Sequence, residues 1–166
     1  MIIRFTEKLA KKLKLGPITK IDDKPDNPYL EWYANYFTAN RVQYVMVTNA
    51  ASLLTIVMYG RGMTDNDSFL KQVTSQLGDY LKEIDCELIF SRIIAPNFGM
   101  ARLSKTADRS VLGTMKLMAE ILKIKLEAVE LCPMDLTEYI NTNNFNAIDF
   151  QQPIEAFKAL KLDKRP

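Results

Sequence analysis

The sequence has 166 residues, a formal net charge of +2 and 48% hydrophobic residues, and it contains no histidine. This length suffices for one domain with a substantial core, whereas so small a charge does not by itself indicate nucleic-acid binding. The lack of histidine excludes Ser-His-Asp and Cys-His catalysis and histidine zinc sites. We therefore assign no catalytic residue, no metal and no cofactor. The balance is against an enzyme, which would have to use carboxylates, lysine, tyrosine or a hard cation.

The cellular compartment is predicted from the opening residues, the apolar runs and the cysteines. No apolar run is long enough to cross a bilayer, and the opening residues, Met-Ile-Ile-Arg-Phe-Thr, do not resemble a signal peptide. Cys86 and Cys132 are far apart in sequence and form no motif. We expect two reduced thiols in a cytoplasmic protein without a membrane partner.

The N-terminal part of the chain is predicted to form a strand, a helix and a loop. Residues 2–5 alternate in the manner of a strand, and Thr6 can cap a helix over residues 7–15 that stops at Gly-Pro. The prolines and charges of residues 18–29 disfavour regular structure. We interpret this segment as a surface loop of the domain rather than a boundary.

One face of the first predicted helix is basic, with Lys8, Lys11 and Lys12 spaced to lie together. This pattern suits a small basic patch for nucleic acid or for an acidic partner. It equally suits a solvated helix face, which is the more common origin of so short a run of charge.

Three aromatic or β-branched segments follow, at residues 31–37, 42–47 and 53–59. Their short connections predict an antiparallel meander, in which Asn40 and Asn49 serve the turns. Because the second and third segments are apolar on both sides, we expect central strands that are covered on both faces.

The middle of the chain contains one strong helical pattern. Residues 67–84 place apolar side chains on one face, and the polar residues 64–67 before them resemble a capping box. Residues 86–94 fit either a short helix or a strand. Residues 96–99, Pro-Asn-Phe-Gly, predict a turn.

A strand at residues 100–105 is predicted to lead through a turn into a long helix that begins at Asp108 or Ser110. The apolar stripe of this helix is wide enough for a helix covered on much of its girth. Lys116 and Glu120 stand one turn apart and are able to pair. The stripe consists of Val111, Leu112, Met115, Met118, Ala119, Ile121, Leu122 and Leu126.

The start of this helix is a candidate anion site. Free backbone amides and the helix dipole favour an anion there, and Lys105, Arg109 and Ser110 add charge and hydrogen-bonding groups. Arg41, beside a predicted turn, is a further candidate for the same pocket. In the alternative interpretation Arg109 pairs with Asp108 or another acidic neighbour, and Lys105 is simply solvated.

Residues 105–115 read Lys-Thr-Ala-Asp-Arg-Ser-Val-Leu-Gly-Thr-Met, which resembles the signature Lys-Thr-x-Asn/Asp-Arg-Ser-Val-Leu-Gly-Ser/Thr-Met of a bacterial family of unknown function. The opening residues 3–6 and the segment that begins at Trp32 also resemble this family. The family pattern continues with Asn-Asp, where this chain has Lys116 and Leu117. The resemblance implies no activity, and for residues 86–94 it favours a helix.

Together these patterns predict one α+β domain over residues 1–166, with a small, mostly antiparallel sheet of four to five strands packed by helices. Residues 128–166 are expected to form a C-terminal helical extension, with helices at 133–141 and 153–160. The favoured function is a non-catalytic binding or regulatory module whose partner is a protein or a small anionic ligand. The alternatives are a nucleotide- or phosphate-binding protein or enzyme that uses the anion site, and a weak nucleic-acid binder.

Overall fold

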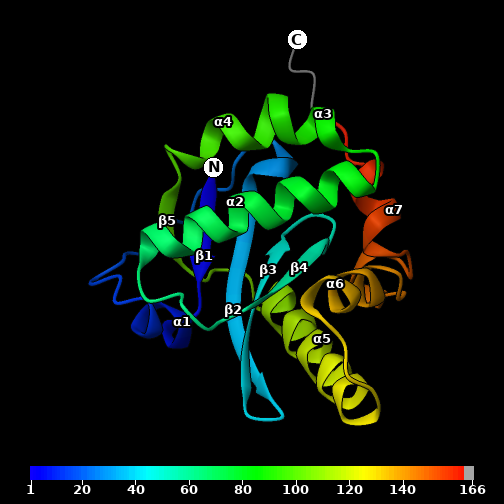
Figure 1. Cartoon of the computed structure of the whole chain (residues 1–166). Coiled ribbons are helices and arrows are strands. Elements are labelled where there is room, and N and C mark those ends of the chain that lie inside the picture. Colours follow the sequence, from blue (N-terminus) through cyan, green and yellow to red (C-terminus); the bar gives the residue numbers. More distant parts are fainter. Residues whose placement is uncertain (163–166) are drawn as a thin grey trace.

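The computed structural model describes residues 1–162, and its centre is a five-stranded sheet in the order β4-β3-β2-β1-β5 (Figure 1). Strands β2, β3 and β4 form the predicted antiparallel meander, whereas β1 runs parallel to both β2 and β5. The sheet is therefore mixed, and the prediction of a mostly antiparallel sheet is wrong for the pairs β1–β2 and β1–β5. The strands are β1 (Ile2–Phe5), β2 (Glu31–Ala39), β3 (Val42–Asn49), β4 (Thr55–Tyr59) and β5 (Arg102–Lys105).

Helices cover both faces of the sheet. On one face a large core joins the strands to α1, α2, the α3–α4 segment and α7, and Figure 1 shows α2 crossing in front of the strands. On the other face a second core joins them to α5 and α6. The helices are α1 (Glu7–Lys12), α2 (Asn66–Glu83), α3 (Glu87–Ile89), α4 (Ala95–Phe98), α5 (Arg109–Ala128), α6 (Pro133–Asn141) and α7 (Pro153–Lys158).

Side-chain caps define where the helices begin. The Thr6 hydroxyl accepts a hydrogen bond from the Leu9 amide at the start of α1. Asp65 and Ser68 form a reciprocal capping box at the start of α2. Asp108 caps α5 by accepting from two backbone amides. These short polar side chains satisfy amides that have no partner within the helix, so the local sequence fixes these starts.

The segment between α2 and β5 is helical almost throughout. Residues 86–94, which fitted either a helix or a strand, form α3 and a π-helical stretch, Phe90–Ile94. The turn predicted at residues 96–99 is wrong for the most part, because α4 continues to Phe98. Pro96 lies in the first turn of α4, directly after the π-helical stretch.

The C-terminal helices are integrated into the domain rather than appended to it. Phe157 of α7 is fully buried in the larger core, and Leu136 and Ile140 of α6 are fully buried in the other core. The last four residues of the predicted extension, 163–166, lie outside the described residues.

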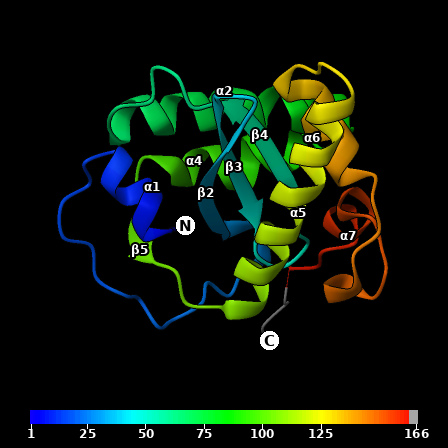
Figure 2. The same ribbon diagram turned by 90° about the horizontal axis from the view of Figure 1, so that it is seen from below.

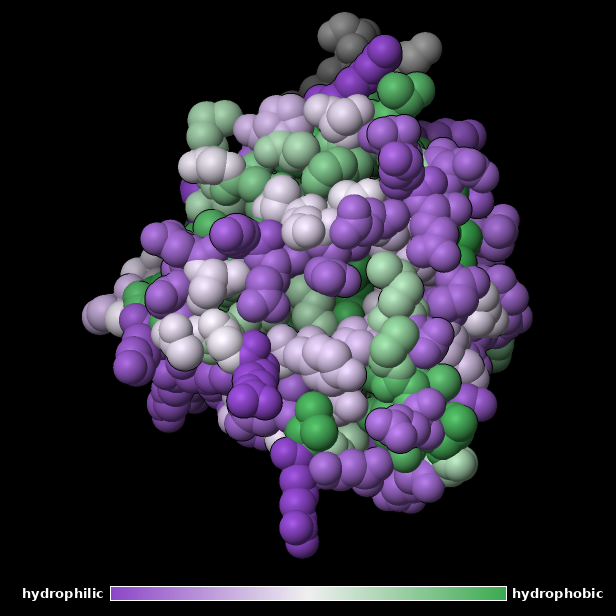
Figure 3. Space-filling model, in the orientation of Figure 1, coloured by the Kyte–Doolittle hydropathy of each residue, from purple (hydrophilic) through white to green (hydrophobic). Residues whose placement is uncertain are grey.

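Figure 3 shows hydrophilic residues over most of the α2 face, and hydrophobic residues gather near the end of α5 and the segment that leads to α6.

Candidate functional site

The chain turns to opposite faces of the sheet after the paired parallel strands β1 and β5. The chain leaves β1 into α1, whose buried residues belong to the core on one face of the sheet. It leaves the neighbouring β5 into α5, which packs on the opposite face. Where adjacent parallel strands send their helices to opposite faces, a crevice opens at the carboxyl ends, and α/β proteins bind ligands in such crevices.

A pocket of about 650 Å³ lies at this divergence. Its volume is within the range of small-molecule sites. The apolar part of its wall comes from Phe5, Ala10, Pro17 and Ile18, and the polar part comes from α1, the turn after it and the end of β5. The full lining is Phe5, Glu7, Ala10, Lys11, Lys14, Gly16, Pro17, Ile18, Lys105 and Thr106.

Three lysines surround this pocket, and one carboxylate balances part of their charge. Lys11 Nζ lies 2.9 Å from Glu7 Oε1, one helical turn away. The hydrogen bond from Lys11 is the main reason that the pKa of Glu7 lies below its usual value, and Lys105 lowers it further. Within residues 1–162, the ammonium groups of Lys14 and Lys105 make no hydrogen bond or ion pair. The pocket therefore has an excess of positive charge.

The outer wall of the pocket is fixed by the loop that follows α1. The Lys105 amide donates to the Thr19 carbonyl at 3.2 Å, and the Ile21 amide donates to the Ser104 hydroxyl at 2.9 Å. These bonds hold residues 19–21 along the outer edge of β5. Of the predicted loop at residues 18–29, residues 18–27 contain neither helix nor strand, and a 3-10 helix, Pro28–Leu30, begins at its end.

A buried arginine anchors the same loop. Arg4 on β1 is fully buried, and its Nε donates to Glu31 Oε1 at 2.6 Å. Its remaining nitrogens donate to the carbonyls of Ile21 and Asp23 and to the hydroxyl of Ser104. Because a buried charge needs such partners, Arg4 holds the loop against the sheet and positions the wall of the pocket.

The predicted anion site at the start of α5 is occupied by the protein itself. Asp108 Oδ1 accepts from the amides of Ser110 and Val111 at 2.9 and 3.4 Å, which are the groups that an external anion would need. Arg109 and Ser110 are exposed and do not line the pocket at β1 and β5. Within residues 1–162 Arg109 has no ion pair, and Asp108 pairs with Lys24 at 3.4 Å.

Lys105 and Arg41, two further residues of the predicted site, lie in different places. Lys105 lines the pocket at the ends of β1 and β5. Arg41 belongs to the two-residue turn between β2 and β3, and its neighbour Asn40 donates to the Leu126 carbonyl near the end of α5. At 1.5 Å per helical residue, this turn is about 25 Å from the start of α5. The structure therefore does not bring Arg41 to Arg109.

The three lysines of the predicted basic patch each have a partner. Lys11 pairs with Glu7, Lys12 donates to the Met63 carbonyl at 3.2 Å, and Lys8 lies over the ring of Tyr36, 4.5 Å from its centroid. Of these contacts, only the pair of Lys11 with Glu7 offsets a positive charge of this face.

Sequence reasoning missed Lys14, which faces the same pocket as Lys105. Lys14 follows the end of α1 and has a left-handed backbone, with φ of 52°, and Gly16 has φ of 70°. These two residues turn the chain back across the end of the sheet. The Gly-Pro pair indicated the turn, but no local signal showed that it closes against residues 105 and 106.

Among residues 1–162, no helix has the length and apolar composition required to cross a membrane. In the same range, no three His, Cys, Asp or Glu side chains gather in a way that could hold a metal ion.

These observations define the class of protein. It is an α+β domain with a mixed sheet, and lysines line a pocket at the ends of two parallel strands. Residues 2–156 match the model of the family described as Domain of unknown function (DUF6933), and the chain belongs to this family. A comparison with curated proteins finds no match.

Proposed function

We propose that this domain is a non-catalytic binding module whose ligand is a small organic anion, in which a phosphate or carboxylate is joined to an apolar group. The observation that supports it most is the pocket at the ends of β1 and β5, where three lysines stand around an apolar wall. Lysine ammonium groups bind phosphate as point charges, and apolar walls bury the rest of a ligand. A cytoplasmic location is part of the proposal, supported by two free cysteines.

The non-catalytic part of the proposal rests on Glu7, the only carboxylate that the described residues 1–162 contribute to the pocket lining. A general acid or base works best with a pKa near neutrality, and enzymes raise carboxylate pKa values by burial to achieve this. Glu7 is instead exposed and paired with Lys11, and its pKa is lowered. This carboxylate is held in its charged form and serves to orient Lys11.

A thermal-shift titration tests the proposal. The probes are inorganic phosphate, pyrophosphate, AMP, ADP and benzoate, which separate the anionic group from the apolar group. A probe at about 100 times its dissociation constant stabilises the protein by about 2.7 kcal/mol. We expect the shift to shrink in Lys105→Ala and Lys14→Ala and to persist in Lys82→Ala, a control that removes an exposed lysine of α2. No shift with any probe, or equal shifts in all variants, contradicts the proposal.

Two alternative functions have tests of their own. Nucleotide binding at the start of α5 predicts that Arg109→Ala, and not Lys14→Ala, abolishes the shift with ADP. Nucleic-acid binding through Lys8, Lys11 and Lys12 predicts affinity for mixed DNA and RNA oligonucleotides that falls steeply with salt. A lack of affinity at low salt removes that function.

A further inference from the structure

Helix α5 has a second apolar stripe on the face opposite the core. Leu117 and Ile124, two turns apart, are 53% and 67% exposed, and Ile121 between them is half-buried. Figure 2 shows α5 crossing in front of the strands with no other helix over it. The outward face of a surface helix is normally polar. The prediction that α5 is covered on much of its girth is therefore wrong for the isolated chain.

A glycine lies in the same stripe, one turn before Leu117. At 100° per residue, Gly113, Leu117, Ile124 and Ala128 point away from the buried side of α5. A Cβ added at Gly113 would meet no described atom within 4 Å apart from its chain neighbours and the backbone of α5 itself, so packing against the rest of the described chain does not require glycine there. Glycine is less favourable than alanine inside a helix. A small residue at an outward position allows another helix to approach closely.

A row of alternating charges flanks the stripe on one side. Its members are Lys116, Glu120, Lys123 and Glu127. Glu120 pairs with Lys123 at 2.8 Å, whereas the sequence allowed a pair with Lys116. The row is self-complementary when its direction is reversed, because each lysine then faces a glutamate.

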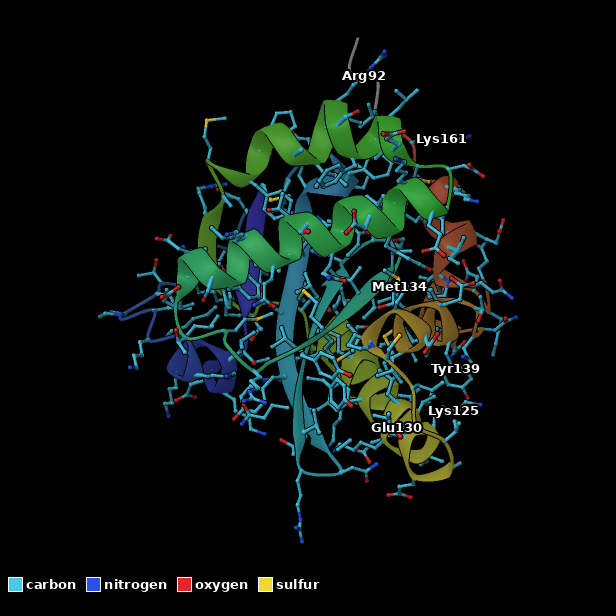
Figure 4. The ribbon with its side chains drawn as sticks, viewed as in Figure 1. Arg92, Lys125, Glu130, Met134, Tyr139 and Lys161 are labelled. Atoms are coloured by element: carbon cyan, nitrogen blue, oxygen red, sulfur yellow. The ribbon has the colours of Figure 1, made fainter. Side chains whose placement is uncertain are left out.

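The other side of the stripe is engaged within the chain. Lys125 Nζ lies 4.8 Å from the ring centroid of Tyr139 on α6, and Figure 4 shows these two side chains side by side where α6 passes the end of α5. The exposed stripe and the row of charges are therefore the parts of α5 that remain for an external partner.

We infer that the partner of this surface is a second copy of the chain, which packs its α5 antiparallel to the first across a two-fold axis near Ile121. The two-fold axis of an antiparallel pair brings the two charged rows to the same side, where Lys116 faces Glu127 and Glu120 faces Lys123 of the second copy. Leu117 of each chain then packs beside Ile124 of the other. A parallel pair would put the charged rows on opposite sides and each residue next to its own copy.

Sedimentation velocity from about 1 μM to about 1 mM tests the dimer. One helix pair buries less than the roughly 1,200 Å² of a standard interface, so we expect a dimer that dissociates on dilution. Leu117→Glu and Ile124→Glu should raise its dissociation constant at least about tenfold. The control Leu88→Glu, at an exposed leucine of α3, should leave it unchanged. A monomer at every concentration, or an equal effect of the control, overturns the inference and leaves the stripe to a different protein.

The antiparallel geometry has its own tests. In a Cys132→Ser background, Leu117→Cys and Ile124→Cys chains should form a disulfide-linked dimer when they are mixed, and neither should do so alone. Lys116→Glu should weaken the dimer, and adding Glu127→Lys to the same chain should restore it. Links between two Leu117→Cys chains, or no restoration in the double variant, contradict this arrangement. All these sites are exposed, and an unchanged thermal midpoint of the dilute variant shows that it is folded.

Discussion

Asn141 on α6 completes the hydrogen bonding of Thr55 on the edge strand β4. Its Oδ1 accepts from the Thr55 amide at 2.9 Å, and its Nδ2 donates to the Thr55 carbonyl at 2.7 Å. Two residues along the strand, the Thr137 hydroxyl accepts from the Val57 amide at 2.9 Å. An edge strand otherwise exposes such groups to pairing with another chain. Side chains of α6 thus close this edge of the sheet in place of a further strand.

Replacing Asn141 by alanine should lower the free energy of unfolding by about 3 kcal/mol, because the substitution leaves two buried backbone groups without partners. Urea unfolding followed by circular dichroism measures this loss. Asn144→Ala, at an exposed asparagine in the following loop, is the matched control and should change stability by less than about 0.5 kcal/mol. Equal effects of the two substitutions would show that the closure of β4 contributes little.

Replacing Arg4 by methionine should release the loop of residues 18–27 from the sheet. The change removes a buried charge that Glu31 needs as a partner, and breaking such a pair costs about 3–5 kcal/mol. We expect faster tryptic cleavage after Lys20 and a lower free energy of unfolding. Arg102→Ala removes an exposed arginine from the neighbouring strand β5 and should leave the cleavage rate unchanged. Resistance of the Arg4 variant to trypsin would contradict the anchoring role.

The cap of α2 should contribute to stability above the usual pKa of aspartate and not in acid. The hydrogen bond from the Ser68 amide lowers the pKa of Asp65 below its usual 3.8. A carboxyl group with a lowered folded-state pKa stabilises the protein above its unfolded pKa, and the contribution disappears as the pH falls through the folded pKa. Thermal midpoints between about pH 5 and pH 2.5 should therefore fall less steeply for Asp65→Asn, which keeps a capping oxygen and does not titrate. Parallel curves for the two proteins would exclude this contribution.

Two helical glycines should respond differently to alanine. Gly113→Ala adds a methyl group that meets no described atom within 4 Å apart from its chain neighbours and the backbone of α5, and we expect the dilute protein to gain up to about 1 kcal/mol. At Gly78 the added Cβ would lie 2.8 Å from Cε1 of Phe90, so Gly78→Ala should be less favourable than Gly113→Ala. Denaturant unfolding of both variants below the concentration of dimerisation provides the comparison. A gain at Gly78 equal to that at Gly113 would show that the Phe90 ring moves away freely.

Local patterns in the sequence predicted the elements well and their partners less well. Periodicity and caps located the five strands and the helices α2, α5 and α6 within a few residues, because these signals act over a single turn or strand. The pairing of β1 with β5 depends on a crossover through most of the chain, and no local signal specifies it. For the same reason, the alternation of residues 2–5 did not show that the following loop folds back and buries Arg4.

In the candidate site too, local patterns identified single residues but not the residues that lie together in the fold. Lys105 was found because it precedes a helix start, and Arg109 and Ser110 were grouped with it for the same reason. The Asp108 side chain accepts the hydrogen bond of a free amide at the helix start. The excess of positive charge lies instead in the pocket at the ends of β1 and β5, which Lys14 and Lys105 line. Which cations share a pocket is decided by tertiary contacts such as the bond from Lys105 to Thr19.

Amide chemical shifts, followed by NMR during titration with pyrophosphate and with ADP, test the anion pocket most directly. We expect the perturbed amides to cluster at Lys11, Lys14, Ile18, Lys105 and Thr106, with smaller perturbations in Lys105→Ala at the same probe concentration. Perturbations that cluster at Ser110 and Val111, spread evenly over the surface, or do not occur would contradict an anion-binding pocket at the carboxyl ends of β1 and β5.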